Sequence, residues 1–215
     1  MNTTNGSNYY IKNQVITHKS KINIDFRGVT TIGENALYKY YQEVNNITGS
    51  LLFNNLTSVN KFGLYESFFN CSQLNCSIAF PRLVNIGEYG LYYSFFGCTG
   101  LTGELLFSEL TTIDYCGMAS AFSGCSNLRG NISFPKLASI GKNALESAFK
   151  NCSGLTGSIS FPNLTSVGSY GLYYTFYGSN ITELHFRSDA QSTIEAASGY
   201  SDNFGATNAT IYFDL

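Results

Sequence analysis

The side chains that most often carry enzyme chemistry are few in this 215-residue chain, and they form no recognisable catalytic motif. Its two histidines, His18 and His185, do not stand beside a serine or cysteine in an arrangement typical of nucleophilic catalysis. No metalloprotease, nucleotide-binding or calcium-binding motif is present. Glu104 and Glu109 could together do acid–base work, but scattered carboxylates of this kind usually form a solvated surface. The sequence therefore predicts a protein that is not an enzyme and that needs neither a cofactor nor a metal.

Cysteines are the next candidates for chemistry, and four of the six recur at an interval of 27 residues: Cys71, Cys98, Cys125 and Cys152. If this interval stacks them, neighbouring cysteines lie about 5 Å apart, the spacing of parallel strands. Side chains in such a column point the same way, so a disulfide between them would need a distorted geometry. We therefore expect unpaired thiols that are buried as small apolar side chains. A disulfide or a metal site in this column is the less favoured alternative.

Tyrosines offer a different kind of chemistry, which is partner binding. Five of them occupy repeat positions that hold alanine, serine or glutamate elsewhere in the chain: Tyr65, Tyr92, Tyr93, Tyr173 and Tyr174. A position required for the core should not accept both tyrosine and glutamate, so we predict that these side chains face solvent. Exposed tyrosine gives a large contact area at a low entropic cost and is enriched in binding sites. The alternative is that these rings only fill space between neighbouring segments.

A second surface with binding potential is polar. It consists of the outward positions of the predicted strands: Thr48, Ser50, Asn75, Ser77, Thr102, Glu104, Arg129, Asn131, Thr156 and Ser158. Stacked strands would present them in parallel rows about 5 Å apart. Short hydroxyl and amide groups suit a saccharide or a polar protein surface, and they equally suit plain solubility.

The element that must position all of these residues is the 27-residue repeat. Phenylalanine marks it twice, once at Phe53, Phe80, Phe107, Phe134 and Phe161, and again at Phe68, Phe95, Phe122, Phe149 and Phe176. A fixed period of this length is typical of a solenoid, in which each unit buries its apolar face by stacking on the next. We predict that both phenylalanine columns lie in the core.

The repeat also predicts how the chain is organised, as one domain. We expect an N-terminal cap at 1–19, a degenerate first coil at 20–46, coils at 47–73, 74–100, 101–127, 128–154 and 155–180, the start of a last coil at 181–186, and a helix–strand cap at 187–215.

Within each unit the hydrophobic pattern changes from strand-like to helix-like. Residues 155–161 alternate between apolar and polar side chains, which predicts a strand that Pro162 ends. Gly168 follows and indicates a bend, and Leu172 and Phe176 are then spaced as on a helix. We therefore predict an α/β, right-handed solenoid of about six coils, with a parallel β-sheet on one face and short helices on the other.

The order of residues in each unit resembles a known family. The pattern L-x-x-x-I-x-F-P-x-L-x-x-I-G, followed by A/G-L-x-x-x-F-x-x-C, is similar to that of BspA-like leucine-rich repeat proteins and covers residues 20–186. One departure is an extra residue, usually glycine, before the strand (Gly49, Gly103, Gly130, Gly157), which suggests a bulge. The resemblance implies a bacterial or protozoan surface or secreted protein with a role in adhesion.

Composition excludes several classes of partner. Charged residues make up 12% of the chain and the net charge is −2, which gives no electrostatic footprint for nucleic acid. No apolar run is long enough to insert in a membrane. The first residues lack the pattern of a signal peptide, so we expect export by another route, or a fragment or processed form.

These observations lead to two functional hypotheses. The first is a non-enzymatic recognition or adhesion module, extracellular or at the cell surface, that binds a host protein or glycan. The alternative is a structural spacer, or the terminal segment of a larger surface or phage-tail-type fibre protein.

Overall fold

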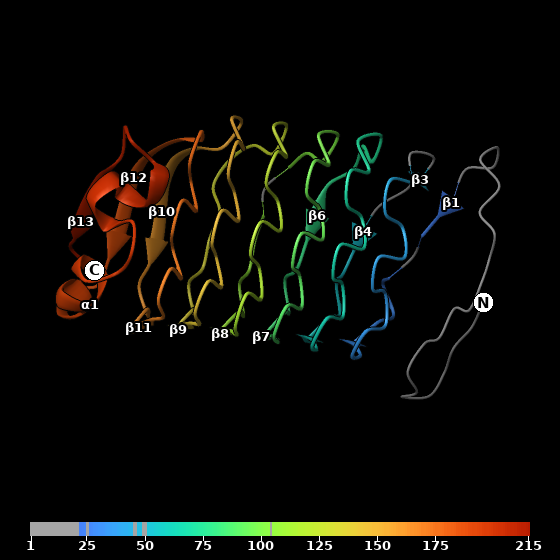
Figure 1. The fold of residues 1–215 in the computed structure, drawn as a ribbon, viewed down its shortest axis with the longest axis horizontal. Coiled ribbons are helices and arrows are strands. Elements are labelled where there is room, and N and C mark those ends of the chain that lie inside the picture. The colour runs from blue at the N-terminus through green and yellow to red at the C-terminus, as the bar shows by residue number, and fades with distance from the viewer. Residues whose placement is uncertain (1–21, 25, 45–46, 49–50, 104) are drawn as a thin grey trace.

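The chain winds into a parallel solenoid of about seven turns (Figure 1). The computed structural model describes residues 22–215 except 25, 45–46, 49–50 and 104. The predicted N-terminal cap at 1–19, together with Gly49 and Glu104, lies outside the described residues. The predicted handedness of the winding stays a prediction.

One face of the solenoid is a six-stranded parallel sheet made of two-residue strands. In spatial order they are β11 (Ser166–Val167), β9 (Ser139–Ile140), β8 (Thr112–Ile113), β7 (Asn85–Ile86), β5 (Ser58–Val59) and β2 (Thr31–Ile32). Neighbouring strands pair one repeat apart, so that Ile86 lies opposite Ile113 and Ile113 opposite Ile140. The valine or isoleucine of each strand points into the core. After β11 the backbone comes so close to the preceding coil that a Cβ on Gly168 would lie 2.5 Å from the amide nitrogen of Lys142, which explains the glycine.

The segments predicted as strands form a second, more broken set of pairings. These are β1 (Ile22–Asn23) with β3 (Ile47–Thr48), β4 (Leu51–Leu52) with β6 (Ile78–Ala79), and the sheet of β10 (Thr156–Phe161), β12 (Asn180–Phe186) and β13 (Thr210–Phe213). In β10 the predicted alternation holds, since Ile159 and Phe161 are buried and Ser160 is exposed. A bulge interrupts this sheet at Gly157, but the extra residue is Thr182 of β12, which lies between the partners of Gly157 and Ser158.

The prediction of short helices opposite the sheet is wrong. The segments 34–43, 61–70, 88–97, 115–124, 142–151 and 169–178 are runs of consecutive turns, which we call the turn wall. Alternate amides make different bonds: the Ser67 amide donates to the Leu64 carbonyl within its own coil, and the Glu66 amide donates to Tyr92 of the next coil. Every fourth residue has a positive φ, as at Glu66 (48°), which no α-helix allows. Each segment of the turn wall is therefore hydrogen-bonded to the equivalent segment of the next coil, as neighbouring strands are in a sheet.

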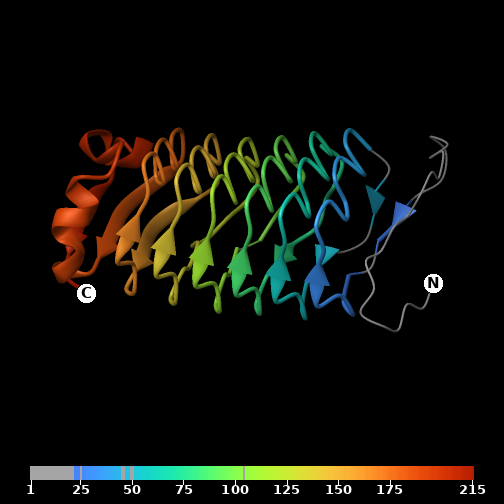
Figure 2. The same ribbon diagram turned by 60° about the horizontal axis from the view of Figure 1, so that its bottom comes forward.

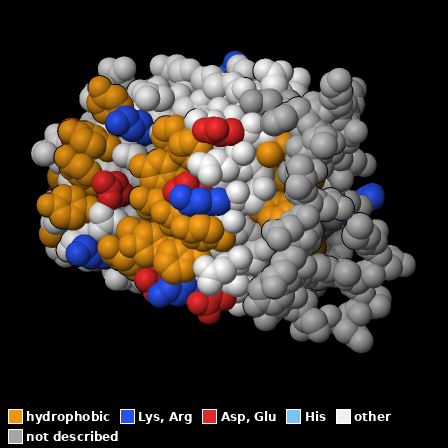
Figure 3. Space-filling view, turned by 45° about the vertical axis from the view of Figure 1, so that its right-hand side comes forward, with side chains coloured by type: hydrophobic (Ala, Val, Ile, Leu, Met, Phe, Trp, Pro, Cys, Tyr) orange, Lys and Arg blue, Asp and Glu red, His pale blue; other side chains and the backbone are white. Residues whose placement is uncertain are grey.

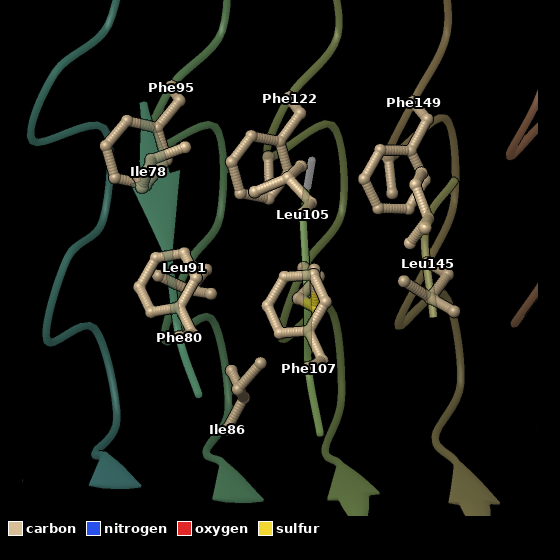
Figure 4. Packing of buried hydrophobic residues seen from close by; sticks show 14 of the residues in the cluster. Ile78, Phe80, Ile86, Leu91, Phe95, Leu105, Phe107, Phe122, Leu145 and Phe149 are labelled. Carbon is tan, nitrogen blue, oxygen red and sulfur yellow. The ribbon is translucent and has the colours of Figure 1, made fainter. Parts of the chain in front are cut away.

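The two predicted phenylalanine columns form the core, which confirms that part of the prediction. Every member of both columns is fully buried. Figure 4 shows Phe95, Phe122 and Phe149 in one row, with Phe80 and Phe107 in the other. Successive rings stack almost parallel, with centroids 5.3 Å apart between Phe95 and Phe122. Stacking occurs because the coil spacing matches the offset separation that aromatic rings prefer.

The C-terminal residues cover one end of the solenoid (Figure 2). They form a 3-10 helix at Ser188–Ala190, the short helix α1 (Gln191–Glu195), another 3-10 segment at Tyr200–Gly205, and β13. β13 adds to the parallel sheet beside β12, and the buried ring of Phe204 lies 6.1 Å from that of Phe186. The last coil is thereby given both an apolar cover and a strand partner.

Candidate functional site

Aromatic side chains gather on the outer surface of the turn wall. They form three stacks across successive coils, which we call the aromatic ladder: Tyr38, Tyr65 and Tyr92; Phe62 and Tyr89; and Phe69 and Phe96, with Tyr93 beside them. The centroid distances are 4.8 Å from Tyr38 to Tyr65 and 4.9 Å from Tyr65 to Tyr92. The repeat places these residues one above another, so the ladder follows from the same register that builds the core.

The middle ring of the stack of Tyr38, Tyr65 and Tyr92 has both faces covered, so that it can offer a partner only its edge. Tyr65 lies between Tyr38 and Tyr92 with interplanar angles of 12° and 18°, so both its faces are occupied. Tyr65 and Tyr92 are half-buried, and Tyr38 is 45% exposed. Burial, with a further contribution from Tyr93, raises the pKa of Tyr92 to about 12. The tyrosine hydroxyl is therefore a neutral hydrogen-bond donor at physiological pH.

Paired charges surround the ladder. Lys39 makes a 3.1 Å ion pair with Glu66, and Lys61 makes a 2.8 Å pair with Glu88. The Lys39 ammonium also lies 5.7 Å from the centre of the Tyr65 ring. Figure 3 shows one face of the molecule on which hydrophobic side chains lie among such lysines and carboxylates. The surface is thus amphipathic, and its charges are largely balanced.

The five tyrosines predicted as binding residues do not form one patch. Tyr65, Tyr92 and Tyr93 lie together in the ladder, where the Tyr92 and Tyr93 centroids are 4.6 Å apart. Tyr173 and Tyr174 belong to a second aromatic cluster, made of Tyr170, Tyr173, Tyr174 and Tyr177.

The two coils that separate this cluster from the ladder have one exposed ring among their described residues, that of Tyr115, which lies 5.2 Å from the Tyr89 ring at the end of the ladder. In the first of them the equivalent residues are small and buried, namely Cys116, Ala119, Ser120 and Ser123. In the second, Asn143 and Glu146 hydrogen-bond each other. The chain therefore carries two aromatic surfaces along one wall.

Sequence reasoning missed Tyr38, which extends the ladder by one coil. It lies one repeat before Tyr65, so the signal was present in the degenerate first coil.

The remaining candidates for chemistry are structural. All six cysteines are unpaired and buried, which for the four of the repeated column is the predicted state. In the repeated column each thiol donates to a carbonyl of the preceding coil, as Cys98 does to Phe68 at 3.0 Å, and burial raises the pKa of Cys98 well above its usual range. Among the described residues no group of histidines, cysteines and carboxylates is arranged to hold a metal ion. Glu109, once considered with Glu104, forms an ion pair with Lys136.

The comparison with protein-family models agrees with this architecture. The family model described as the BspA type leucine rich repeat region matches residues 30–172 and 119–204, in six copies. This chain belongs to the BspA-type leucine-rich repeat family. A similar solved structure is the crystal structure of the T. pallidum leucine rich repeat protein, with 19% identity, a TM-score of 0.46, and coverage of 77% of this chain and 69% of that chain. No curated protein sequence matched.

Membership of the BspA-type family fixes the broad class of function. Leucine-rich repeat solenoids are generally non-enzymatic and support protein interaction, and BspA-type proteins are typically surface-associated. Within the described part of the chain, no helix has the length and apolarity to span a bilayer.

Proposed function

We propose that this BspA-type chain is a non-enzymatic recognition module, secreted or at the cell surface, whose aromatic ladder binds a host protein. The observation that carries the proposal is the alignment of exposed and half-buried rings over three consecutive coils, beginning at Tyr38 and Tyr65 and ending at Tyr92. Tyrosine-rich surfaces of this kind combine apolar area with hydroxyl groups that donate hydrogen bonds.

The stacking favours a protein partner over a glycan. A sugar ring usually packs against the open face of an aromatic side chain, whereas both faces of Tyr65 are covered by Tyr38 and Tyr92. Ring edges, hydroxyl groups and the nearby Lys39–Glu66 pair suit the mixed polar and apolar surface of a protein.

The test is a binding screen of the whole chain against host-cell surface proteins and, in parallel, a glycan array. Once a protein ligand is identified, the double variant Tyr65→Ser, Tyr92→Ser is expected to weaken binding at least tenfold while circular dichroism stays unchanged. The matched control is Tyr173→Ser, Tyr174→Ser, which changes the second aromatic cluster and should leave the affinity as it was.

Two results would contradict the proposal. Full binding by the Tyr65 and Tyr92 variant would remove the ladder as the site. A chain that binds glycans but no protein, or neither, would favour the polar strand face or the spacer role instead.

A further inference from the structure

One edge of the C-terminal sheet has no strand beside it among the described residues. In the order β10, β12, β13, the strand β13 is the last, and Figure 1 shows it on the side of β12 away from β10. The segments of the cap lie instead over the preceding turn wall, where the Phe176 amide donates to the Phe204 carbonyl at 3.0 Å. An open strand edge is a template on which another strand can pair.

The inner side of β13 is less well covered than that of β12. Leu184 and Phe186 are buried, whereas Ile211 and Phe213, which lie opposite them in the sheet, are half-buried. Both residues of β13 have a neighbouring strand on one side only. Pairing with a further strand would remove more of their apolar surface from water, which is favourable.

The hydrogen bonds next to β13 show which of its backbone groups face the open edge. Just beyond the strand, the Leu215 amide donates to the Phe186 carbonyl, and the Leu215 carbonyl accepts from the Ser188 amide. In a strand the N–H and C=O of one residue point to the same side, and those of the next residue point to the other. The residues that alternate with Leu215 therefore face the open edge, and these are Thr210, Tyr212 and Asp214.

The sequence of β13 favours pairing at this edge. All four of its residues are β-branched or aromatic, and none is charged or a proline, so it lacks the devices that usually keep an edge strand unpaired. The Tyr212 ring is 39% exposed and stacks on His185 of β12 with centroids 4.8 Å apart. The other face of the Tyr212 ring is therefore directed to the open edge.

The edge is complementary to itself in one antiparallel register. A twofold axis at Tyr212 places this residue opposite Tyr212 of the partner subunit, and the two exchange both of their N–H···O bonds. Thr210 then lies opposite Asp214 of the partner subunit, whose carboxylate accepts from the threonine hydroxyl. On the inner side, Ile211 lies opposite Phe213 of the partner subunit. In this register apolar side chains meet apolar ones, and no two like charges lie opposite each other.

We propose that the open edge of β13 is a self-association site, through which two copies of this chain form a twofold-symmetric dimer with one continuous sheet. The added strand is antiparallel because both copies use the same edge, and a contact between identical surfaces is isologous. The aromatic ladder lies on other coils, so this proposal and the proposed function can fail independently.

The first experiment measures the mass of the whole chain by sedimentation equilibrium. A reversible monomer–dimer equilibrium is expected with a dissociation constant on the order of 10⁻⁴ M, because one short strand buries less than the roughly 800 Å² per partner of a standard interface. The chain with Tyr65→Ser and Tyr92→Ser is the matched control and should dimerise equally. Three results would overturn the proposal: a monomer at millimolar concentration, assemblies larger than a dimer, or loss of the dimer in the control.

The second experiment removes one backbone donor from the open edge. Tyr212→Pro eliminates the outward N–H and leaves the bonds to β12 in place, because those come from the alternate residues. The variant should keep its circular dichroism spectrum and lose the dimer. A folded Tyr212→Pro chain that still dimerises would contradict the proposal.

Opposite charges at one position give a test that leaves the backbone unchanged. Thr210→Arg puts a guanidinium group against Asp214 of the partner subunit and should tighten the dimer several-fold, whereas Thr210→Glu puts like charges together and should weaken it. Equal dissociation constants for the two variants would show that Thr210 does not lie at the interface.

Cysteine pairs test the register itself. Opposite residues of a hydrogen-bonded antiparallel pair have Cα atoms about 5.5 Å apart, which a disulfide can span. Tyr212→Cys should therefore form a disulfide-linked dimer on mild oxidation, and Thr210→Cys and Asp214→Cys should link to each other in a mixture but not to themselves. The native cysteines are buried, so they do not compete. Absence of the Tyr212→Cys link, or self-linking of Thr210→Cys, would overturn the twofold register.

Discussion

Each core phenylalanine of the two columns except Phe176 stacks between the equivalent aromatic rings of the coils before and after it. Phe122 stacks between Phe95 and Phe149, with centroids at 5.3 Å and 5.6 Å, and has no exposed surface. Aromatic rings in such a column stabilise two coil interfaces at once, whereas a ladder tyrosine such as Tyr92 keeps part of its surface in water. The same repeat thus produces fully buried aromatic residues, which contribute strongly to stability, and half-buried ones, which contribute less.

The first prediction compares these two kinds of aromatic residue. Phe122→Ala is expected to lower the free energy of unfolding by about 3–5 kcal/mol, because it removes a buried ring and leaves a cavity. Tyr92→Ser should cost clearly less, since the ring is half-buried at the surface. Urea unfolding followed by circular dichroism measures both. A Tyr92 variant as unstable as the Phe122 variant would show that the ladder belongs to the core.

Sequence reasoning succeeded for residues wherever the environment is set by stacking. The phenylalanine columns and the buried thiols follow from one rule, that equivalent residues lie above each other. It grouped Tyr173 with Tyr92, whereas the two lie in separate clusters because Ala119 and Glu146, which carry no ring, stand between them in the same column.

At the scale of the element, the turn wall explains why short helices were predicted. Leu64 and Phe68 are four residues apart and both buried, as on a helix, yet a turn wall also returns to the same face every four residues. The signal that distinguishes the two is the backbone: positive φ recurs at Phe62, Glu66 and Asn70. Residues with bulky side chains rarely adopt positive φ angles. The backbone preferences of the single residues therefore do not predict the turn wall, which forms because the coils stack.

The second prediction tests the backbone of the turn wall. Gly124 has a φ of 79°, and the nearest atom to a Cβ built on it is 3.6 Å away, so Gly124→Ala would add strain without a clash. The free energy of unfolding should fall by roughly 1–2 kcal/mol, the cost of a left-handed conformation for an L-residue. Gly28→Ala is the control, because nothing lies within 4 Å of its Cβ position and its φ is not positive. Thermal unfolding measures the stability of both variants. Equal stability of the Gly124→Ala and Gly28→Ala chains would contradict the prediction.

The C-terminal strands contain a titratable contact. Nδ1 of His185 in β12 lies 2.9 Å from a carboxylate oxygen of Asp214, just beyond β13, and Nε2 lies 3.3 Å from Glu183. The hydrogen bond with Asp214 raises the pKa of His185 above its usual value, with a smaller contribution from Glu183. Since the folded pKa exceeds the unfolded one, the contact stabilises the folded state fully below about pH 6.5 and is lost as pH rises through the folded pKa.

The third prediction follows from this contact. Asp214→Asn should lower the pKa of His185. The variant should also lose the increase in the free energy of unfolding that the native chain shows when the pH falls through the His185 pKa. The imidazole resonances in an NMR titration report the pKa, and thermal unfolding at several pH values reports the stability. An unchanged His185 pKa in the variant would show that Asp214 is not its partner in solution.

At the scale of the whole molecule, the solenoid is a series of nearly equal interfaces. Each coil contacts its neighbours through the sheet, the turn wall and the phenylalanine columns, and the register stays at one repeat across β2, β5, β7, β8, β9 and β11. The free energy of unfolding is therefore close to the sum of the contributions of the coils and of the interfaces between adjacent coils. Whole coils can be removed if the two ends that are joined occupy equivalent repeat positions.

The fourth prediction removes residues 101–154, the two coils that separate the aromatic surfaces. Gly100 would then be followed by Leu155, which occupies the same repeat position as Leu101. The shortened chain should fold, be about 10 Å shorter by small-angle scattering, and unfold at lower urea because two interfaces are lost. Tyr173 would then follow Tyr92 directly in one continuous ladder. An unfolded product would show that the interfaces are not interchangeable.

The alternating hydrogen bonds of the turn wall also make the two ends of the solenoid different. Every second amide there donates to the coil that follows, as Phe68 does to Ser94, and the wall's carbonyls receive from the coil that precedes. If coils at the C-terminal end open, the newly uncovered wall loses partners for its amides, and deuterium enters at every other position. If coils at the N-terminal end open, only carbonyl oxygens of the next turn-wall segment are uncovered. The amides of that segment keep their partners, and their hydrogen-exchange rates do not change. Amide exchange would thus reveal which end of the solenoid unravels first.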